Sequence, residues 1–237
     1  MEQFLASPEA DFDEIVFAVR APGTDHWYAN FGYYSAPTRE YPPAQRAPEG
    51  VKLPPIYKDG GRLCRLNLRT GEVTVLLEDL DGSIRDPQVH YDAEKLIFSY
   101  RRGGEEFFHL YEINIDGTGL TQLTDGPYND IEPAYLPDGG IMFCSDRCLR
   151  FVNCWISPVA TLYRCEGDGS GVRMISTNIE HDNTPWVLPD GRILYMRWEY
   201  VDRSQSHFHH LWTTNPDGTS QMVYYGNQHP GYTMIDA

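Results

Sequence analysis

Short apolar runs separated by turn residues recur along the whole chain, and almost none of them has the period of a helix. In residues 140–144 the side chains alternate, so that Met142 and Cys144 share one face of a predicted strand while Ile141 and Phe143 share the other. Comparable runs elsewhere are bounded by Gly, Pro, Asn or Asp, which is typical of short β-strands. The pattern therefore predicts an all-β protein.

A longer phrase repeats around these strands. Pro133-Ala-Tyr-Leu-Pro-Asp-Gly recurs as Pro185-Trp-Val-Leu-Pro-Asp-Gly, and a weaker copy begins at Pro87. Each copy leads into an apolar strand and is followed further on by an Asp-Gly pair. A period of roughly 40 to 50 residues that carries several short strands is typical of a β-propeller blade. The Asp-Gly pairs begin at Asp116, Asp168 and Asp217.

The repeat also predicts where the blades lie. We expect four-stranded antiparallel blades, because each repeat contains four β-rich runs, with a Pro-rich insertion at 35–60 inside the first blade. Four blades and the start of a fifth indicate part of a larger propeller of six to eight blades, and a closed four-bladed ring is the alternative. The predicted blades are about 13–80, 85–125, 130–177 and 181–226, and the fifth blade opens at 229–237.

Composition narrows the classes of partner. The formal net charge is −15, from 19 basic and 34 acidic residues, and this excludes the basic stripe expected of a nucleic-acid-binding protein. No apolar run approaches the roughly 18 residues that a membrane-spanning helix needs. The first ten residues also lack the basic start and apolar stretch of a signal peptide. Neither nucleic acid nor membrane insertion is therefore expected.

The blade geometry sorts the polar residues onto one face. The Leu-Pro-Asp-Gly and Asp-Gly turns lie at one end of an up-and-down blade, so the remaining loops meet at the other end, the loop face. Charged and aromatic residues gather there, and loops on a rigid scaffold are where binding sites concentrate. They could form a ring that binds a cation or polar ligand, or each carboxylate could tie its own loop to the next blade through backbone N–H groups. The predicted loop-face set is Asp86, Asp130, Glu132, Arg147, His181, Asp182 and Trp198.

Histidines and cysteines supply further candidates. His207 and His209 have the i,i+2 spacing of ligands on one strand face and, with His181 and Asp182, are candidate ligands for a divalent cation. The alternative is that they are structural sheet residues. Cys148 and Cys154 would form a disulfide in an oxidising compartment or stay free thiols in cytosol. No Cys-x-x-Cys-His motif is present, so this chain itself predicts no haem attachment.

Two resemblances extend these predictions. The segments 116–124, 131–139 and 143–147 resemble the repeat of TolB-like propeller proteins, and 85–91, 180–186 and 197–203 resemble the propeller domain of proteins related to the hydrazine synthase alpha subunit. The second resemblance implies a periplasmic or extracellular location and a longer protein. Several proteins of that kind carry c-type haem domains beside the propeller. This resemblance also implies that the partners are other domains or subunits of the longer protein.

The function that follows is a non-catalytic binding or scaffold domain of a larger exported protein. One alternative is a part of a hydrazine synthase-like oxidoreductase, in which the loop face supplies ligands to a metal or to a haem held by a neighbouring domain. A TolB-like protein-interaction module is the other alternative. No pair of residues has a spacing that assigns acid and base roles, so the sequence predicts no catalytic residue in this chain.

Overall fold

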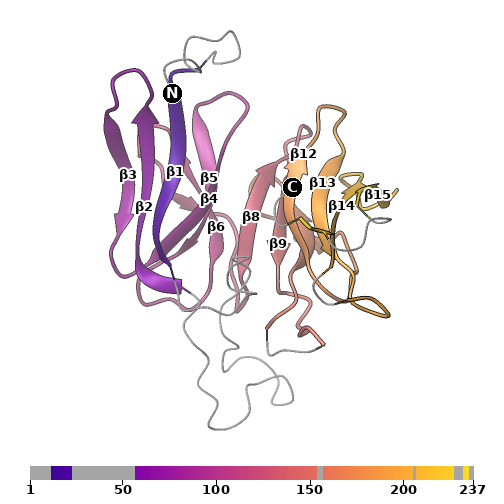
Figure 1. Cartoon of the computed structure of the whole chain (residues 1–237). Coiled ribbons are helices and arrows are strands. Elements are labelled where there is room, and N and C mark those ends of the chain that lie inside the picture. The colour runs from indigo at the N-terminus through magenta and orange to yellow at the C-terminus, as the bar shows by residue number, and fades with distance from the viewer. Residues whose placement is uncertain (1–11, 23–56, 154–156, 205–206, 227–231, 235–237) are drawn as a thin grey trace.

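A computed structural model of the chain describes residues 12–22, 57–153, 157–204, 207–226 and 232–234. Within these ranges the regular elements are β-strands, gathered in four sheets (Figure 1). None of these residues belongs to a helix long and apolar enough to span a membrane.

The four sheets follow one another along the chain. The first sheet contains β1 (Glu14–Pro22), β2 (Tyr57–Asn67) and β3 (Val73–Asp79), and the second contains β4 (Ser83–Val89), β5 (Lys95–Arg101), β6 (His109–Asn114) and β7 (Thr121–Gln122). The third sheet contains β8 (Asp130–Tyr135), β9 (Ile141–Ser145), β10 (Thr161–Cys165) and β11 (Arg173–Met174). The fourth sheet contains β12 (Asp182–Val187), β13 (Ile193–Trp198), β14 (Phe208–Thr214) and β15 (Met222–Tyr225), with β16 (Tyr232–Thr233) beside β14.

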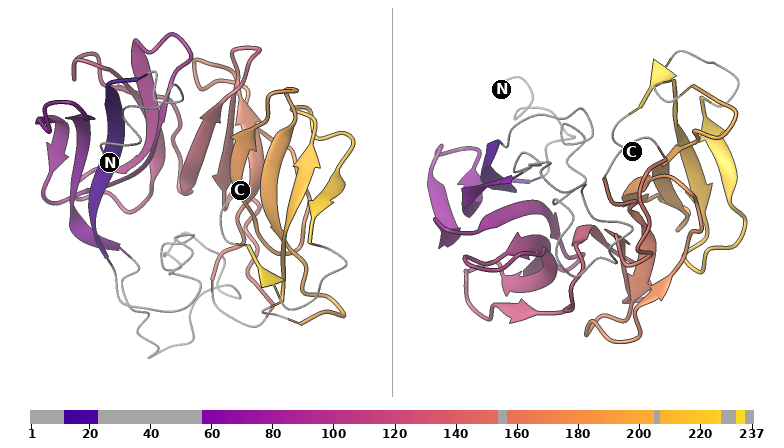
Figure 2. Two further views of the ribbon diagram at one scale, coloured as in Figure 1. Left: turned by 45° about the horizontal axis from the view of Figure 1, so that its top comes forward. Right: turned by 90° about the horizontal axis from the view of Figure 1, so that it is seen from below.

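Each sheet is a meander in which consecutive strands pair antiparallel. The first strands of the second, third and fourth sheets, β4, β8 and β12, contact one another in that order and form the inner side of the array. The sheets stand face to face and fan out around a common axis, as the view from below shows (Figure 2). This arrangement confirms the predicted all-β propeller fold.

The core lies between the sheets, so the middle sheets are buried on both faces. Met142 and Cys144 belong to the cluster between the third and fourth sheets, whereas Ile141 and Phe143 belong to the cluster between the second and third. The alternation predicted for this strand is therefore confirmed. It also explains why β9 is apolar throughout its length, since both of its faces meet another sheet.

The Asp-Gly turns connect two strands of one blade and pack against the preceding blade. Gly117, Gly169 and Gly218 all have φ between +84° and +88°, a conformation in which glycine has no steric penalty. Each also lies against the backbone of the preceding sheet: a Cβ added to Gly169 would lie 2.0 Å from the carbonyl oxygen of Leu123, and one added to Gly218 would lie 2.6 Å from that of Ile175. The glycines are thus needed both for the turn and for the close approach of adjacent blades.

Each inner strand bends at one residue that precedes a proline. Asp86, Glu132 and Thr184 have φ of 55°, 56° and 50°, which is rare for residues other than glycine. The strand pairing shifts register at all three places, so each bend is a β-bulge. Because the three residues occupy equivalent places in the repeat, the strain is a regular feature of the blade and not a local irregularity.

Two predicted boundaries differ from the structure or fall outside it. The strand expected from Gly61 begins at Tyr57, because Tyr57 pairs with Pro22 across a register shift, and the insertion residues 35–56 lie outside the described residues. His229 and Pro230, where the fifth blade was expected to open, also lie outside them. The Met234 N–H bonds to the His209 carbonyl, just as the Asp130 N–H bonds to the Phe108 carbonyl, so β16 takes the position in which β8 begins.

The contacts of Gly169 generate a first prediction. Gly169→Ala should lower the free energy of unfolding by about 3 kcal/mol, because the new methyl group meets the Leu123 carbonyl and the residue is held at positive φ. Gly139→Ala is the matched control, since Gly139 has φ of 86° and nothing within 4 Å of the added Cβ; it should lose only about 1 kcal/mol. Urea denaturation of the two variants measures the difference, and equal losses would contradict the inter-blade contact.

Candidate functional site

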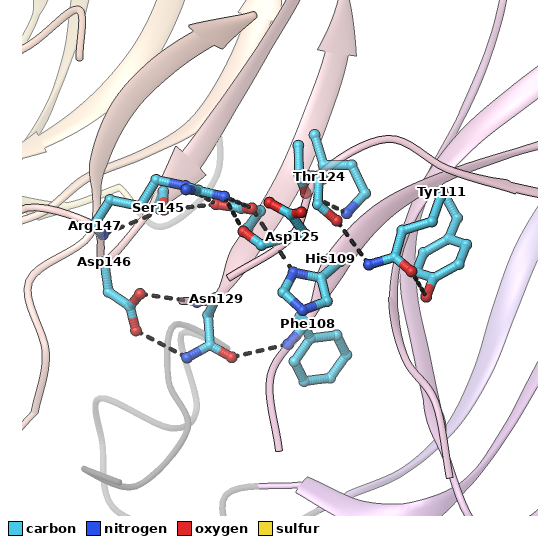
Figure 3. Close-up of polar contacts among 12 residues, drawn as sticks. Phe108, His109, Tyr111, Thr124, Asp125, Asn129, Ser145, Asp146 and Arg147 are labelled. Atoms are coloured by element: carbon cyan, nitrogen blue, oxygen red, sulfur yellow. Dashed lines mark hydrogen bonds and ion pairs between the residues drawn. The ribbon is translucent and has the colours of Figure 1, made fainter. Parts of the chain in front are cut away.

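The loop-face set begins with Asp130 at the start of β8. Its carboxylate is fully buried and accepts hydrogen bonds from Arg147 (Nη2 at 2.6 Å and Nε at 2.9 Å) and from the hydroxyl of Ser145 (2.7 Å). His109 Nδ1 lies 4.0 Å away. Burial alone would raise the pKa of Asp130, but nearby His109 and the hydrogen-bonded guanidinium of Arg147 hold it below its usual value. Figure 3 shows Arg147, Ser145 and His109 close to one another in this part of the site.

Arg147 and the adjacent Asp146 hold the loop that leads into β8. The Arg147 guanidinium donates to the Asp125 carbonyl at 2.7 Å and lies 4.7 Å from the centre of the Tyr128 ring. Asp146 accepts two hydrogen bonds from Asn129, from the backbone N–H and the side-chain amide, each at 2.8 Å (Figure 3). The charged side chains of this loop are therefore engaged with one another across β8 and β9.

Asp86 and Glu132 connect three sheets. The Asp86 carboxylate accepts the backbone N–H of Glu132 at 3.2 Å, and the Glu132 carboxylate in turn accepts the backbone N–H of Thr184 at 2.8 Å. In both bonds the acceptor is the residue with positive φ in one inner strand, and the donor is the residue with positive φ in the next inner strand. We call Asp86, Glu132 and Thr184 the inter-blade relay. Buried Arg85 pairs with both carboxylates, with its Nη2 3.1 Å from Glu132. Burial raises the pKa of Glu132 to about 7, although Arg85 opposes that shift.

His181, Asp182 and Trp198 lie together between the third and fourth sheets. The His181 Nδ1 accepts the backbone N–H of Ala160 at 3.1 Å, and its ring packs on Trp198 with centroids 5.4 Å apart. Asp182 accepts the Asn178 amide at 3.1 Å. Burial depresses the pKa of His181 well below its usual range and raises that of Asp182 to about 6. Trp198 is fully buried, so it does not form the rim of an open cleft.

The candidate metal ligands differ in burial. His207 is exposed and precedes β14, whereas His209 is buried and stacks on Trp198 at 5.0 Å. Among the described residues, no group of three or more His, Cys, Asp or Glu side chains is placed to hold a metal ion. A divalent cation held by these residues therefore stays a prediction, and we derive no chemistry from one.

The cysteines are placed in two ways. Cys144 and Cys165 lie in different core clusters, on opposite faces of the third sheet, and burial raises the pKa of both thiols. The predicted pairing of Cys148 with Cys154 stays a prediction, because Cys154 lies outside the described residues. The thiol of Cys148 lies 3.2 Å from the Val159 carbonyl.

A cleft lies at the other end of the inner strands, near the Leu-Pro-Asp-Gly turns, where the sequence predicted no site. Its volume is about 170 Å³. The repeat contains the signal that could have found it, since most of its lining comes from the two residues after each proline of the repeated phrase. The lining residues are Gln88, Val89, Tyr91, Ala134, Tyr135, Trp186 and Val187.

Comparison with known proteins places this architecture. No family model matches the sequence. Hydrazine synthase subunit alpha from Kuenenia stuttgartiensis is 33% identical over an alignment of 195 residues, and the match covers 60% of this chain and 24% of that subunit. The solved structure of Kuenenia stuttgartiensis hydrazine synthase aligns with a TM-score of 0.63 at 21% identity, over 91% of this chain and 32% of that one. TolB from Acinetobacter baumannii aligns with a TM-score of 0.52 at 15% identity, over 69% and 37%.

The chain therefore has the β-propeller fold that TolB also has. Its sequence is similar to hydrazine synthase subunit alpha, and it spans about a quarter of that subunit's length. Both resemblances predicted from the repeat are confirmed. The activity and partners of the whole relative are not thereby assigned to this chain.

A buried carboxylate beside His181 generates a second prediction. Glu180 is fully buried, and burial raises its pKa to about 7, although the Asn153 backbone and Arg150 offset part of the shift. The folded state therefore binds a proton more tightly than the unfolded state, and the stability present below pH 4.5 is lost as the pH rises toward 7. Glu180→Gln, which cannot ionise, should match wild type near pH 4.5 and exceed it by about 2 kcal/mol at pH 8.

The test is the free energy of unfolding of Glu180→Gln and wild type across that pH range. Glu94→Gln is the control, because it removes one negative charge from an exposed side chain and not from a buried one. A Glu180→Gln gain that is as large at pH 4.5 as at pH 8 would show that ionisation of the buried carboxyl is not responsible.

Proposed function

We propose that this chain is a binding or scaffold propeller domain of a larger exported protein. The proposal rests on one observation: carboxylates of the loop-face set are hydrogen-bonded and paired with other residues of the same domain. Asp130 is held by Arg147, and Glu132 is held by Arg85 and by the Thr184 backbone. Carboxylates fixed in this way strengthen the frame and are not poised as an acid and base pair.

The length relation supports the same proposal. A chain related to a quarter of hydrazine synthase subunit alpha corresponds to one domain of such a protein, and a rigid propeller is suited to hold other domains or subunits in place. Export and attachment to c-type haem domains belong to the proposal through this relationship. The TolB-like alternative assigns the loop face to recognition of a separate protein.

One observation favours a second candidate function, a domain of an oxidoreductase subunit. The 33% identity to a subunit of hydrazine synthase is the support for it. In that case the loop face would contribute a ligand to a metal or haem held by another part of the protein. His181 is the residue of the loop-face set whose ring nitrogen could act in this way, since burial keeps the imidazole neutral.

His181→Gln in the full-length protein separates the two candidates and supplies a third prediction. A scaffold domain predicts an unchanged visible absorption spectrum and metal content, with a lower melting temperature because the bond to the Ala160 N–H and the stacking on Trp198 are weakened. His90→Gln is the control, because His90 lies at the other end of the blade. An altered spectrum or a lost metal in His181→Gln, but not in His90→Gln, would favour the oxidoreductase candidate. Export is tested separately by cell fractionation, and recovery of the protein from the cytoplasm would contradict it.

A further inference from the structure

The cleft at the turn end of the inner strands has features of a ligand site that the loop face lacks. Residues at equivalent places of three blades line it, and they differ in kind: Gln88, Ala134 and Trp186. The small Ala134 leaves the space between a side-chain amide and an indole ring. If these equivalent positions served only to pack one blade against the next, similar side chains would suffice at all three.

Trp186 is unusual for an inner strand. It is 49% exposed, whereas Ala134, its equivalent in the third sheet, is 4% exposed. Trp buries more apolar area than most side chains and is enriched where one face of the ring meets a partner. A half-exposed indole at the wall of a cleft is therefore available for stacking.

The opposite wall is held rigidly. The Tyr91 hydroxyl donates to the Tyr135 carbonyl at 2.8 Å, and the Tyr135 hydroxyl donates to Glu112 at 2.8 Å. The His90 ring meets Tyr135 edge-on, with centroids 4.7 Å apart. Because these contacts are already made without a ligand, binding would lose less side-chain entropy than binding to unpaired side chains.

The lining of the cleft contains no Asp, Glu, Lys or Arg side chain. Nearby Lys95 and Glu112 pair with each other at 2.8 Å. Gln88 therefore supplies the cleft's neutral polar group, with an amide that both donates and accepts. An ionic ligand would therefore find no side chain of opposite charge in this lining.

We infer that this cleft binds one ring of a neutral sugar, stacked on Trp186 and hydrogen-bonded to Gln88. A sugar ring combines a face of C–H groups with hydroxyls at its edge, which matches an aromatic wall beside an amide. The volume of about 170 Å³ suits a single ring and is below the 300–1,000 Å³ typical of sites for larger ligands. An apolar side chain of a partner would fill the space but leave the Gln88 amide without a partner, which is costly.

The inference is independent of the scaffold role, because the cleft and the loop face lie at opposite ends of the strands. Cellotriose, chitotriose and maltotriose are the neutral probes, and trigalacturonate is the anionic one. Saturation-transfer NMR on the native full-length protein should show contact with at least one neutral trisaccharide and weaker contact with trigalacturonate. The methyl glycoside of the same sugar should bind nearly as well if a single ring is recognised.

Three variants localise the binding. Trp186→Ala should weaken it at least about tenfold, and Ala134→Leu should abolish it by filling the space while all aromatic rings are kept. Tyr225→Ala is the matched control, since Tyr225 is a 59% exposed aromatic residue on an outer strand of the same sheet, and it should leave binding unchanged. The inference is overturned if no neutral sugar binds, if Trp186→Ala binds normally, or if N-acetyl-phenylalanine amide occupies the cleft in place of sugars.

Discussion

The propeller depends on a hydrogen bond between strained residues of neighbouring inner strands. Asp86, Glu132 and Thr184 each sit at positive φ before a proline, and the first two carboxylates accept the backbone N–H of the next residue in the series. A strained φ of this kind costs on the order of 1–3 kcal/mol and persists only where the surroundings hold it. Here the surroundings are the next blade, so the bend of each strand and the placement of its neighbour are one interaction.

This interaction explains why the charged side chains of the loop face pair with other groups of the same domain. A carboxylate taken out of water must be paired and hydrogen-bonded, and Arg85 together with backbone N–H groups meets that need for Glu132. Asp130 obtains the same from Arg147. Removing Arg85 or Arg147 would leave a buried carboxylate without its charged partner. The loop-face end of the propeller is therefore held rigidly by these pairs. The other end, where Trp186 stays half exposed, is less constrained by charge.

The fold could be predicted from the sequence because its signals are local. Asp-Gly turns and the alternation of residues 140–144 depend on near neighbours in the chain, and both appear in the structure. The partners of Asp130 and Glu132 could not be predicted, because spacing does not reveal which residue of another sheet will face a carboxylate. Both residues were placed in a loop but lie in β8. The cleft beside Trp186 was missed for the same reason, since its walls meet only after three blades pack.

Hydrogen exchange of the Glu132 backbone N–H measures the central claim most directly. The account predicts that this N–H is protected nearly to the level of global unfolding, and that Asp86→Ala greatly accelerates its exchange while the Thr184 N–H stays protected by Glu132. Ser99, whose hydroxyl lies 3.1 Å from the Glu132 nitrogen, is replaced by Ala in a companion variant to separate its share. Exchange of the Glu132 N–H that is fast in the wild type, or unchanged by Asp86→Ala, would contradict the account.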